Sequence, residues 1–217
     1  MIVSQIIQTG FPVVHLSDTV QEVLDLMDSY ELFHLPVVEK GVYIGLISKA
    51  VLEDTSDEQK RVSTFRPLLS PVSCNDQAFF FDALQLMVAN SLSLLPVIQS
   101  DIFAGVITAK ELLRVIAGFL NAQDKCGVLV IESDPLRFSL GEVNRLIESN
   151  DLSILHFSSR RESGLLIATL LVSKLDIATA VATLQRHGYV VKYYFGTGEE
   201  DHEVQENFQH LLSYLNI

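Results

Sequence analysis

Apolar residues recur at intervals of three and four in two stretches of the chain, and this spacing predicts two amphipathic helices of about three turns each. The two stripes are Val20, Val23, Leu24 and Met27, and Phe80, Ala83, Leu84 and Met87. Asp18-Thr19 precedes the first stripe and Asn75-Asp76 precedes the second, and these residue types cap helix N-termini. The pattern therefore predicts the same element twice.

Two short apolar strands follow each of these helices. Pro36 and Pro96 are expected to open the first strand of each copy, because a proline, which has no N–H to donate, is tolerated at the first residue of a strand. A turn leads into the second strand, Val42–Ser48 or Ile102–Thr108, and a closing helix comes next. Each copy thus has the order helix, strand, strand, helix.

The two copies are related in sequence as well as in pattern. Shifting the chain by 60 residues aligns Val20–Asp54 with Phe80–Arg114 without a gap, and 10 of the 35 aligned positions are identical. Such self-similarity indicates an internal duplication of one structural unit.

The repeated motifs resemble the cystathionine-β-synthase (CBS) domain. They are the helix ending in Leu-Met (26–27 and 86–87), the Leu-Pro-Val tripeptide (35–37 and 95–97), and Gly-Leu-Ile-Ser (45–48) paired with Gly-Val-Ile-Thr (105–108). The resemblance covers residues 1–122, with repeat 1 at about 11–55 and repeat 2 at about 71–116. It implies an α/β (α+β) fold in which two domains pack through their sheets into a disc that commonly forms homodimers.

The resemblance also implies a ligand. CBS domains bind adenosine-containing molecules, among them AMP, ADP, ATP and S-adenosylmethionine, in two clefts between the paired domains. Their marker is Gly, two apolar residues, Ser or Thr, two residues and Asp, and in the second copy this series becomes Gly105, Thr108, Lys110 and Glu111. The Thr108 hydroxyl and the helix N-terminus would then meet a phosphate. Glu111 would accept the ribose hydroxyls, and Lys110 would offset phosphate charge.

The first copy departs from this series. Ser48 keeps the hydroxyl, but Val51 stands where the ribose-binding acid belongs. Because an apolar side chain cannot satisfy the two hydroxyls that a bound sugar would bury, we expect this cleft to have lost ribose recognition. In the family, Leu35-Pro36 and Leu95-Pro96 would line the clefts through backbone groups.

Each of these residues also has a purely structural interpretation. Thr108 and Glu111 stand three apart at a helix start, as in a capping box, and Ser48 is typical of a plain N-cap. The two Leu-Pro pairs are equally consistent with core strands. His34 either points into a cleft, packs on a partner subunit, or is a structural histidine whose hydrogen bonds are satisfied, and we favour the last.

The composition changes at residues 121–127, a polar stretch that we expect to be a linker. Residues 123–198 then have a βαββαβ pattern, which predicts a ferredoxin-like sheet of four antiparallel strands with two helices on one face. The expected elements are the strands Val128–Glu132, Ser153–Ser158, Leu165–Val172 and Tyr189–Phe195, the helices Gly141–Glu148 and Ile177–Arg186, and a turn at Ser159–Ser163.

This second domain resembles the ACT domain, the amino-acid-sensing module of metabolic enzymes, by its element order and the Asp134-Pro135 turn ahead of Leu140 and Val143. That family has a glycine just before the helix, whereas Phe138 stands in this stretch and would crowd the pocket. We therefore expect the sheet to serve pairing or docking rather than amino-acid binding. A CBS pair followed by an ACT-like domain resembles the acetoin-utilisation regulatory (AcuB-like) family.

Charge and the remaining residues exclude several function classes. The chain has 15 basic and 27 acidic residues, a net charge of −12, and no basic patch, which argues against nucleic-acid binding. It shows neither a secretion signal nor an apolar run long enough for a membrane span, which predicts a cytoplasmic protein. Cys74 and Cys126 are expected to be free thiols, and no metal-ligand or catalytic constellation is recognised. An acidic turn and a C-terminal amphipathic helix are expected at 199–217.

These observations predict a non-enzymatic regulatory protein that requires no cofactor. An adenosine-containing ligand would bind between the CBS repeats and change the geometry of the pair or dimer, and thereby how the ACT-like domain meets a protein partner. The alternative is a structural or interaction protein with vestigial clefts, which Val51 and Phe138 favour. Residues 1–122 carry 7 basic and 14 acidic residues, so we expect weak binding or a ligand of low charge, such as AMP or an adenosyl cation.

Overall fold

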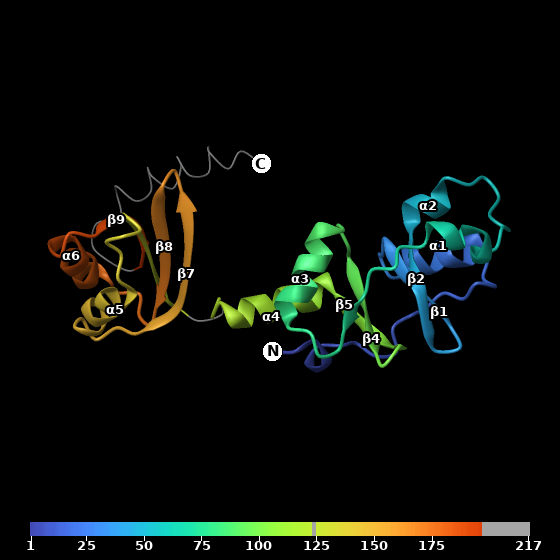
Figure 1. Cartoon of the computed structure of the whole chain (residues 1–217), viewed down its shortest axis with the longest axis horizontal. Coiled ribbons are helices and arrows are strands. Elements are labelled where there is room, and N and C mark those ends of the chain that lie inside the picture. The colour runs from blue at the N-terminus through green and yellow to red at the C-terminus, as the bar shows by residue number, and fades with distance from the viewer. Residues whose placement is uncertain (123–124, 197–217) are drawn as a thin grey trace. The chain divides into compact units, whose positions relative to one another are not determined.

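The computed structural model describes residues 1–122 and 125–196. The chain divides into two compact units, Met1–Ile116 and Ala117–Ile217, and each unit is considered by itself (Figure 1). The division falls inside a helix, α4 (Ala109–Phe119), whereas the composition placed it after residue 122. The turn and helix expected at 199–217 lie outside the described residues.

The first unit contains the order helix, strand, strand, helix twice, as the apolar pattern predicts. The first repeat consists of α1 (Val20–Ser29), β1 (His34–Glu39), β2 (Val42–Ser48) and α2 (Lys49–Glu53). The second repeat consists of β3 (Cys74–Asn75), α3 (Phe80–Ala89), β4 (Leu94–Gln99), β5 (Ile102–Thr108) and α4, and short 3-10 helices occur at η1 (Val3–Gln5) and η2 (Val62–Leu68). β1 and β2 form an antiparallel pair, while β3 runs parallel to β4, which is antiparallel to β5.

The two long helices of the repeats begin differently. α1 begins after the predicted N-cap, Thr19, which forms a reciprocal capping box with Glu22. α3 begins after Phe79, whose side chain has no capping oxygen. The predicted N-cap at Asn75-Asp76 is wrong, because Asp76 is buried and its carboxylate accepts a hydrogen bond from the Gln99 side chain at 2.9 Å.

Pro36 and Pro96 do not open their strands, contrary to the prediction. Each is the third residue of its strand, which begins at His34 or Leu94. The Pro36 carbonyl accepts the N–H of Val14 at 2.9 Å. The chain around Val14 thus forms a short parallel pairing with β1 that starts at the carbonyl of Pro36. The missing N–H of Pro36 lies just where this pairing begins, so the pairing loses no hydrogen bond.

Each repeat is completed by a segment that the sequence pattern left outside it. Residues 1–8 precede the first repeat but pair with the second, since the Gln8 N–H donates to the Val106 carbonyl at 2.8 Å. η2 precedes the second repeat but packs on the first, and just after it Leu46 and Ser70 exchange backbone hydrogen bonds of 2.7 and 2.9 Å. The buried residues that these segments contribute are Val3 and Ile6, and Val62 and Phe65.

The two repeats pack against each other through their sheets. A separate buried cluster joins Leu46 of β2 to Leu94 of β4 and Val106 of β5. The partly buried rings of Tyr43 and Phe103 lie against this cluster. The first unit therefore has three cores, one in each repeat and one between their sheets.

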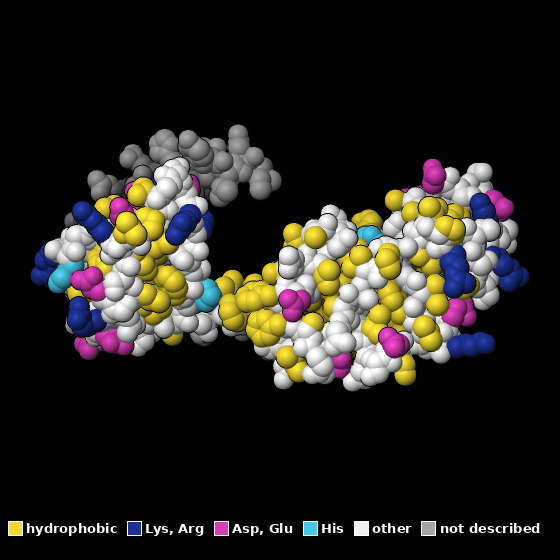
Figure 2. Space-filling view, in the orientation of Figure 1, with side chains coloured by type: hydrophobic (Ala, Val, Ile, Leu, Met, Phe, Trp, Pro, Cys, Tyr) yellow, Lys and Arg dark blue, Asp and Glu magenta, His cyan; other side chains and the backbone are white. Residues whose placement is uncertain are grey.

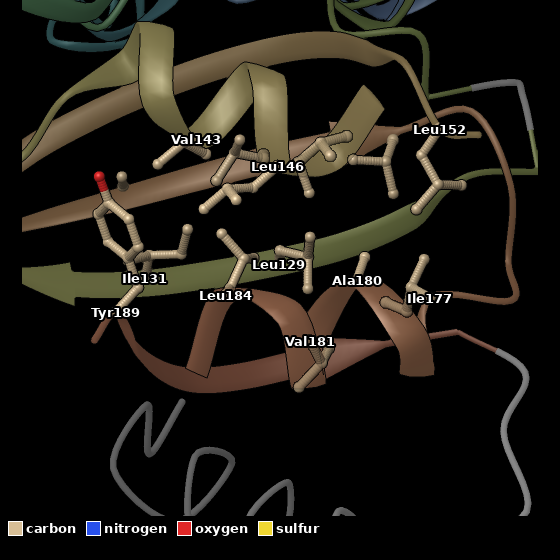
Figure 3. Close-up of a cluster of buried hydrophobic side chains, with 14 residues drawn as sticks. Leu129, Ile131, Val143, Leu146, Leu152, Ile177, Ala180, Val181, Leu184 and Tyr189 are labelled. Atoms are coloured by element: carbon tan, nitrogen blue, oxygen red, sulfur yellow. The ribbon is translucent and has the colours of Figure 1, made fainter. Parts of the chain in front are cut away.

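The second unit has the predicted βαββαβ order. Its elements are β6 (Gly127–Ser133), α5 (Leu140–Glu148), β7 (Ile154–Glu162), β8 (Leu165–Val172), α6 (Ala178–Arg186) and β9 (Val190–Phe195). The strands form one antiparallel sheet in the order β7-β8-β6-β9, which is the ferredoxin-like arrangement. α5 and α6 contribute Val143 and Leu184 to one core with Leu129 of the sheet (Figure 3). Both helices therefore cover the same face.

β7 is longer than predicted. It continues to Glu162, so the turn predicted at Ser159–Ser163 is wrong in its extent. The reversal takes only Ser163 and Gly164, which have φ of 51° and 84° as in a two-residue hairpin turn. The residues mistaken for a turn are polar because this end of β7 is exposed at the edge of the sheet, where polar side chains discourage further strand pairing.

Both cysteines are free thiols, as predicted. Burial raises the pKa of the Cys74 thiol to about 12, so it is protonated and unreactive at neutral pH. Within residues 1–122 and 125–196 no group of His, Cys, Asp and Glu side chains is placed to hold a metal ion. None of the helices in this part of the chain combines the length and apolarity that a membrane crossing needs.

Candidate functional site

The residues of the second ligand series meet at the junction between β5 and α4. Thr108 ends β5, and its hydroxyl accepts the N–H of Glu111 at 3.2 Å, so it caps the helix. The N–H of Ala109 donates to the carbonyl of Ser93 at 2.9 Å, which ties the residue before β4 to the same place. The junction thus brings the hydroxyls of Thr108 and Ser93 and the carboxylate of Glu111 to the positive N-terminal end of α4.

Glu111 contributes the carboxylate of this junction. The Glu111 side chain is only 15% exposed and forms an ion pair with Arg114, whose own side chain is 73% exposed. The carboxylate is turned toward Arg114, so only the Thr108 half of the expected capping box is formed among the described hydrogen bonds. The arginine end of this ion pair is therefore exposed, whereas its carboxylate end is mostly buried. Lys110 is exposed beside it.

The first repeat builds the same junction with different chemistry. Ser48 ends β2, and its hydroxyl accepts the N–H of Val51 at 3.4 Å, as in the N-cap interpretation. His34 is the register partner of Ser48 across the β1–β2 pair. Val51 packs against the first repeat's core, so no carboxylate stands where Glu111 stands in the second repeat.

Each junction holds one buried polar atom that has no hydrogen-bond partner. In the described part of the chain these two atoms are His34 Nδ1 and Ser93 Oγ. An unpaired buried polar atom costs about 1–3 kcal/mol, and such atoms in folded proteins are commonly completed by a ligand or a water. Each atom therefore leaves one hydrogen-bonding position open to a ligand or a water.

Sequence reasoning missed this feature. The favoured interpretation of His34 as a satisfied structural histidine is wrong at Nδ1. Ser93 was not singled out at all, although its place one residue before β4, between Leu92 and Leu94, puts a polar side chain inside an apolar run. That break in the pattern is the signal that could have found it.

The glycine of the ligand series has a structural cause. Gly105 has φ of +146°, and a Cβ there would lie 2.5 Å from the Gln8 carbonyl oxygen, because the N-terminal segment crosses β5 at this point. In the first repeat a Cβ at Gly45 would lie 2.8 Å from the Cβ of Leu69. Glycine is thus required in both copies by the close approach of a completing segment, with or without a ligand.

The Leu-Pro pairs belong to the strands at the centre of each repeat. Leu35 and Leu95 are fully buried in the cores of their own repeats. Pro36 and Pro96 are buried as well. Their side chains are therefore used in packing, and only their backbone could meet a ligand.

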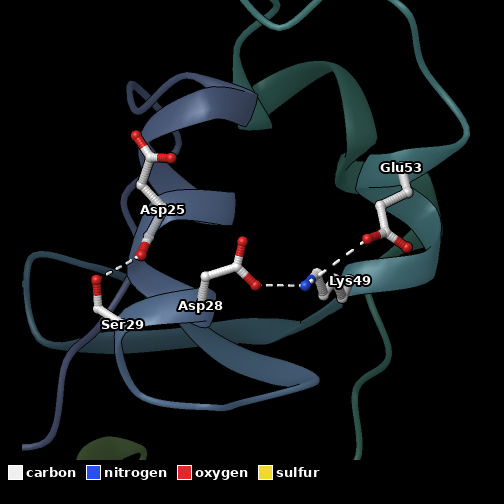
Figure 4. A network of polar contacts seen from close by, with 5 residues as sticks. All are labelled: Asp25, Asp28, Ser29, Lys49 and Glu53. Carbon is white, nitrogen blue, oxygen red and sulfur yellow. Dashed lines mark hydrogen bonds and ion pairs between the residues drawn. The ribbon is translucent and has the colours of Figure 1, made fainter.

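A charged network covers the outside of the first repeat (Figure 4). The ammonium group of Lys49 forms an ion pair with Asp28 and a second, of 3.7 Å, with Glu53. The hydrogen bond to Asp28 raises the pKa of Lys49. The cation next to Ser48 is thereby held by two carboxylates.

In the second unit, aromatic rings fill the place where the ACT resemblance implied a pocket. Phe138 stacks on Phe157 with centroids 6.0 Å apart, and Tyr189 meets it edge-on at 6.3 Å. The Tyr189 hydroxyl donates to Glu142 at 2.8 Å, and burial, together with this bond, raises the pKa of Tyr189. Phe138 therefore acts as a packing residue beside the core of the second unit.

We expect His34→Leu, which installs the residue found at the equivalent position of the second repeat, to make the protein more resistant to mild acid. Burial lowers the pKa of His34, so the unfolded chain binds the proton more readily, and stability falls as the pH drops below about 6.5. Thermal unfolding at about pH 7.5 and 5.5 tests this: the Tm advantage of the variant should grow on acidification. His187→Gln, at an exposed histidine, is the control. An advantage that is the same at both pH values would contradict the prediction.

Comparison with known protein families recognises both copies of the duplicated unit. The sequence model of the CBS domain matches residues 3–50 and 65–118. The first unit is a tandem pair of CBS domains. The first matched segment includes Ser48 and the second includes Thr108, so both junctions lie within recognised CBS domains.

Solved structures are similar to part of this chain. A CBS domain pair/ACT domain protein from Thermotoga maritima is similar with a TM-score of 0.50 and 25% identity, covering 55% of this chain and 99% of that chain. An acetoin utilization protein (AcuB) from Vibrio cholerae has a TM-score of 0.48 and 18% identity over 57% and 95% of the two chains. CBSX2, solved in complex with AMP, has a TM-score of 0.47 and 20% identity over 54% and 96%. The predicted CBS pair and mixed α/β fold are confirmed.

One curated relative is an enzyme. The inosine-5'-monophosphate dehydrogenase of Methanocaldococcus jannaschii is 29% identical over 117 residues, which are 52% of this chain and 23% of that protein. The chain thus spans less than a quarter of this relative's length. A likeness of that extent is no evidence of dehydrogenase activity in this chain.

Proposed function

We propose that this protein is a non-enzymatic regulatory module that binds an adenosine-containing ligand at the β5–α4 junction of its second CBS repeat. The observation that carries the proposal is the unpartnered, buried Ser93 Oγ beside Thr108 and the mostly buried carboxylate of Glu111. A phosphate fits the helix N-terminus and the hydroxyls, and ribose hydroxyls fit the carboxylate. The resemblance to CBS domains, which bind such ligands, supports the same choice.

The charge of the first unit favours a ligand with few phosphates. Residues 1–122 carry 7 basic and 14 acidic residues, a balance of 7 − 14 = −7. Lys110 is the exposed cation beside the junction, while Arg114 is already paired with Glu111. AMP or an adenosyl cation such as S-adenosylmethionine therefore suits this site better than ATP.

The first junction is proposed to bind no ribose. His34 Nδ1 could donate or accept one hydrogen bond there, but Val51 offers nothing to ribose hydroxyls, and Lys49 is held by Asp28 and Glu53. We therefore expect one adenosine ligand per chain.

The position of α4 provides a route from the ligand to the rest of the protein. Its N-terminus forms the junction, and the division between the two units falls within the same helix, between residues 116 and 117. A ligand that draws Thr108, Glu111 and Ser93 together would fix the start of this helix. Such a ligand shifts the protein from one conformation to another only if it binds the two conformations with different affinity. The module is further proposed to act as a homodimer with a protein partner.

Isothermal titration calorimetry with AMP, ADP, ATP and S-adenosylmethionine tests the ligand. We expect one site per chain, and we expect Glu111→Val, which installs the residue of the first repeat, to weaken AMP binding by about 10- to 100-fold, because a charge-assisted pair of hydrogen bonds is lost. Val51→Ala, at the equivalent position of the first repeat, is the matched control and should leave the affinity unchanged. The proposal would be overturned if none of the four ligands, at about millimolar concentration, produced binding heat or a shift in melting temperature.

A structural or interaction protein with vestigial clefts is the second candidate. Val51 at the first junction and the ring packing of Phe138 favour it. It predicts an assembly indifferent to nucleotides. A change in small-angle scattering on adding AMP would therefore count against this candidate and for the regulatory one.

A further inference from the structure

The sheet of the second unit has an outer face, opposite the core that it shares with α5 and α6. Leu129 and Leu170 point into that core. Their neighbours Val128, Val130 and Leu171 therefore point the other way, because side chains alternate along a strand. The solvent-facing side of an antiparallel sheet is normally polar, whereas the centre of this outer face is apolar.

The strand register shows which side chains share the outer face. Residues directly opposite each other on neighbouring antiparallel strands lie on the same face. Three rows cross the sheet in this way: His156-Leu171-Val128-Phe195, Ser158-Thr169-Val130-Tyr193 and Arg160-Ile167-Glu132-Val190. The first two rows contain no Lys, Arg, Asp or Glu, while Glu132 in the third row forms an ion pair with Lys192 at 2.6 Å. We call the apolar members of the first two rows the outer patch: Val128, Val130, Leu171, Tyr193 and Phe195.

The outer patch is not part of the core of the second unit. Val128, Val130 and Leu171 are half-buried, and Phe195 is 36% exposed. Hydrophobic side chains reach the surface of the second unit in the space-filling view (Figure 2). Grouped apolar side chains outside a core indicate that another segment or molecule docks on them.

The chain itself supplies a segment that fits the outer patch. β9 ends at Phe195, inside the patch, and residues 197–217 follow one residue later. Apolar side chains recur in them at helical spacing, at Val204, Phe208, Leu211, Leu212 and Leu215. Residues 207–217 contain no Lys, Arg, Asp or Glu, and the acidic residues of this segment all precede them. An uncharged apolar stripe thus follows directly on the strand that borders an uncharged apolar patch.

The dimensions agree with docking inside one chain. The sheet has four strands, and at about 4.8 Å between neighbours its two edge strands are about 14 Å apart. Residues 196–203, between β9 and the stripe, can span up to about 26 Å when extended. A helix from residue 204 to residue 215 would be about 17 Å long. The stripe can therefore reach the patch and cross the whole sheet.

We propose that residues 204–215 form an amphipathic helix that docks on the outer patch of the same chain. The sheet is then covered on both faces. This accounts for the nearly continuous apolar runs at residues 128–131 of β6 and 165–172 of β8, since strands buried on both faces lose the alternation of apolar and polar residues. A protein partner of the regulatory module has to displace this helix or bind elsewhere.

Photo-crosslinking of the full-length chain tests where the segment docks. We replace Phe208 by the photoreactive analogue p-benzoylphenylalanine, irradiate, and locate the adduct by mass spectrometry. The adduct is expected on Val128, Val130 or Leu171 and at the mass of a single chain. The matched control has the same analogue at His210. It should give about 10-fold less adduct on the patch, because His210 lies about 160° from Phe208 around the helix.

Thermal unfolding of two double variants gives an independent measurement. Leu211→Asp/Leu215→Asp places two charges against the outer patch, and we expect the transition of the second unit to fall by about 5 °C. Gln209→Asp/Ser213→Asp adds the same two charges on the polar side of the helix. This control should melt like the wild type.

Three results would overturn the inference. They are an adduct that joins two chains or lies in the first unit, an equal adduct yield from the control analogue, and an unchanged transition in Leu211→Asp/Leu215→Asp. An adduct between two chains would assign the patch to a second copy instead. Neither measurement involves AMP, so the ligand proposal and this inference can fail separately.

Discussion

Gly105→Ala should lower the Tm of the first unit by about 10 °C or more. The added Cβ would lie 2.5 Å from the Gln8 carbonyl oxygen and 2.6 Å from Cγ2 of Ile7, at a φ of +146°. The N-terminal segment cannot easily retreat, because Gln8 is tied to Val106 by backbone hydrogen bonds of 2.8 and 3.2 Å. Backbone strain and the displaced segment together are expected to cost about 3 kcal/mol or more.

Two other glycines separate the causes of this loss. Gly41 has φ of +81° and nothing within 4 Å of an added Cβ, so Gly41→Ala tests strain alone, at about 1 kcal/mol. Gly118 lies in α4 with open space around it, so Gly118→Ala should be neutral or stabilise by up to about 1 kcal/mol. Differential scanning calorimetry of the three variants gives the comparison. Equal losses at Gly105 and Gly41 would show that the crossing of Gln8 contributes nothing.

The parts of the fold that could be predicted are those set by near neighbours in the sequence. Helical spacing of apolar residues located α1, and an apolar strand pattern located β2 and β5 at their observed bounds. The duplication then showed that the first unit uses one pattern twice. Two strand bounds were predicted wrongly, and the causes are local as well. β7 continues through a polar, exposed stretch to Glu162, and β1 begins two residues before its proline.

What could not be predicted is non-local. Nothing in the spacing of residues 1–8 says that they complete the second repeat rather than the first, because that choice is made by the packing of Val3 and Ile6 in a core whose other residues lie between Cys74 and Val115. The close approaches at Gly45 and Gly105 follow from these crossings. The glycine of each ligand motif is thus explained by the close approach of another segment of the chain, with or without a ligand.

The candidate site shows the same division. The series Thr108, Lys110 and Glu111 could be recognised from its resemblance to the CBS motif, and the structure places it at one helix start. The unpaired Ser93 Oγ could not, because being buried and unpartnered is a property of the assembled fold. A sequence motif therefore located the junction, while the orphaned hydroxyl shows where a ligand would gain a hydrogen bond.

Truncating one side chain in the second unit should leave the CBS pair untouched. Leu129 is fully buried in the core between α5, α6 and the sheet (Figure 3). Leu129→Ala removes its contacts and leaves a cavity, at a cost of about 2–5 kcal/mol. In a calorimetric scan of the full chain we expect the transition of the second unit to fall by about 10–20 °C. The transition of the first unit, and its shift on adding AMP, should stay in place.

The neighbouring residue supplies the control. Val128 is half-buried on the opposite face of β6, away from the core of α5 and α6, so Val128→Ala should cost about 1 kcal/mol. Both substitutions shorten an aliphatic side chain on β6. Leu129 faces the core formed with α5 and α6, whereas Val128 faces the opposite side of the sheet. A loss at Val128 as large as that at Leu129 would show that the outer face of the sheet is packed as tightly as the inner one. A parallel fall of the first unit's transition would show that the two units unfold together, and the ligand and the second unit would then be coupled through global stability rather than through α4 alone.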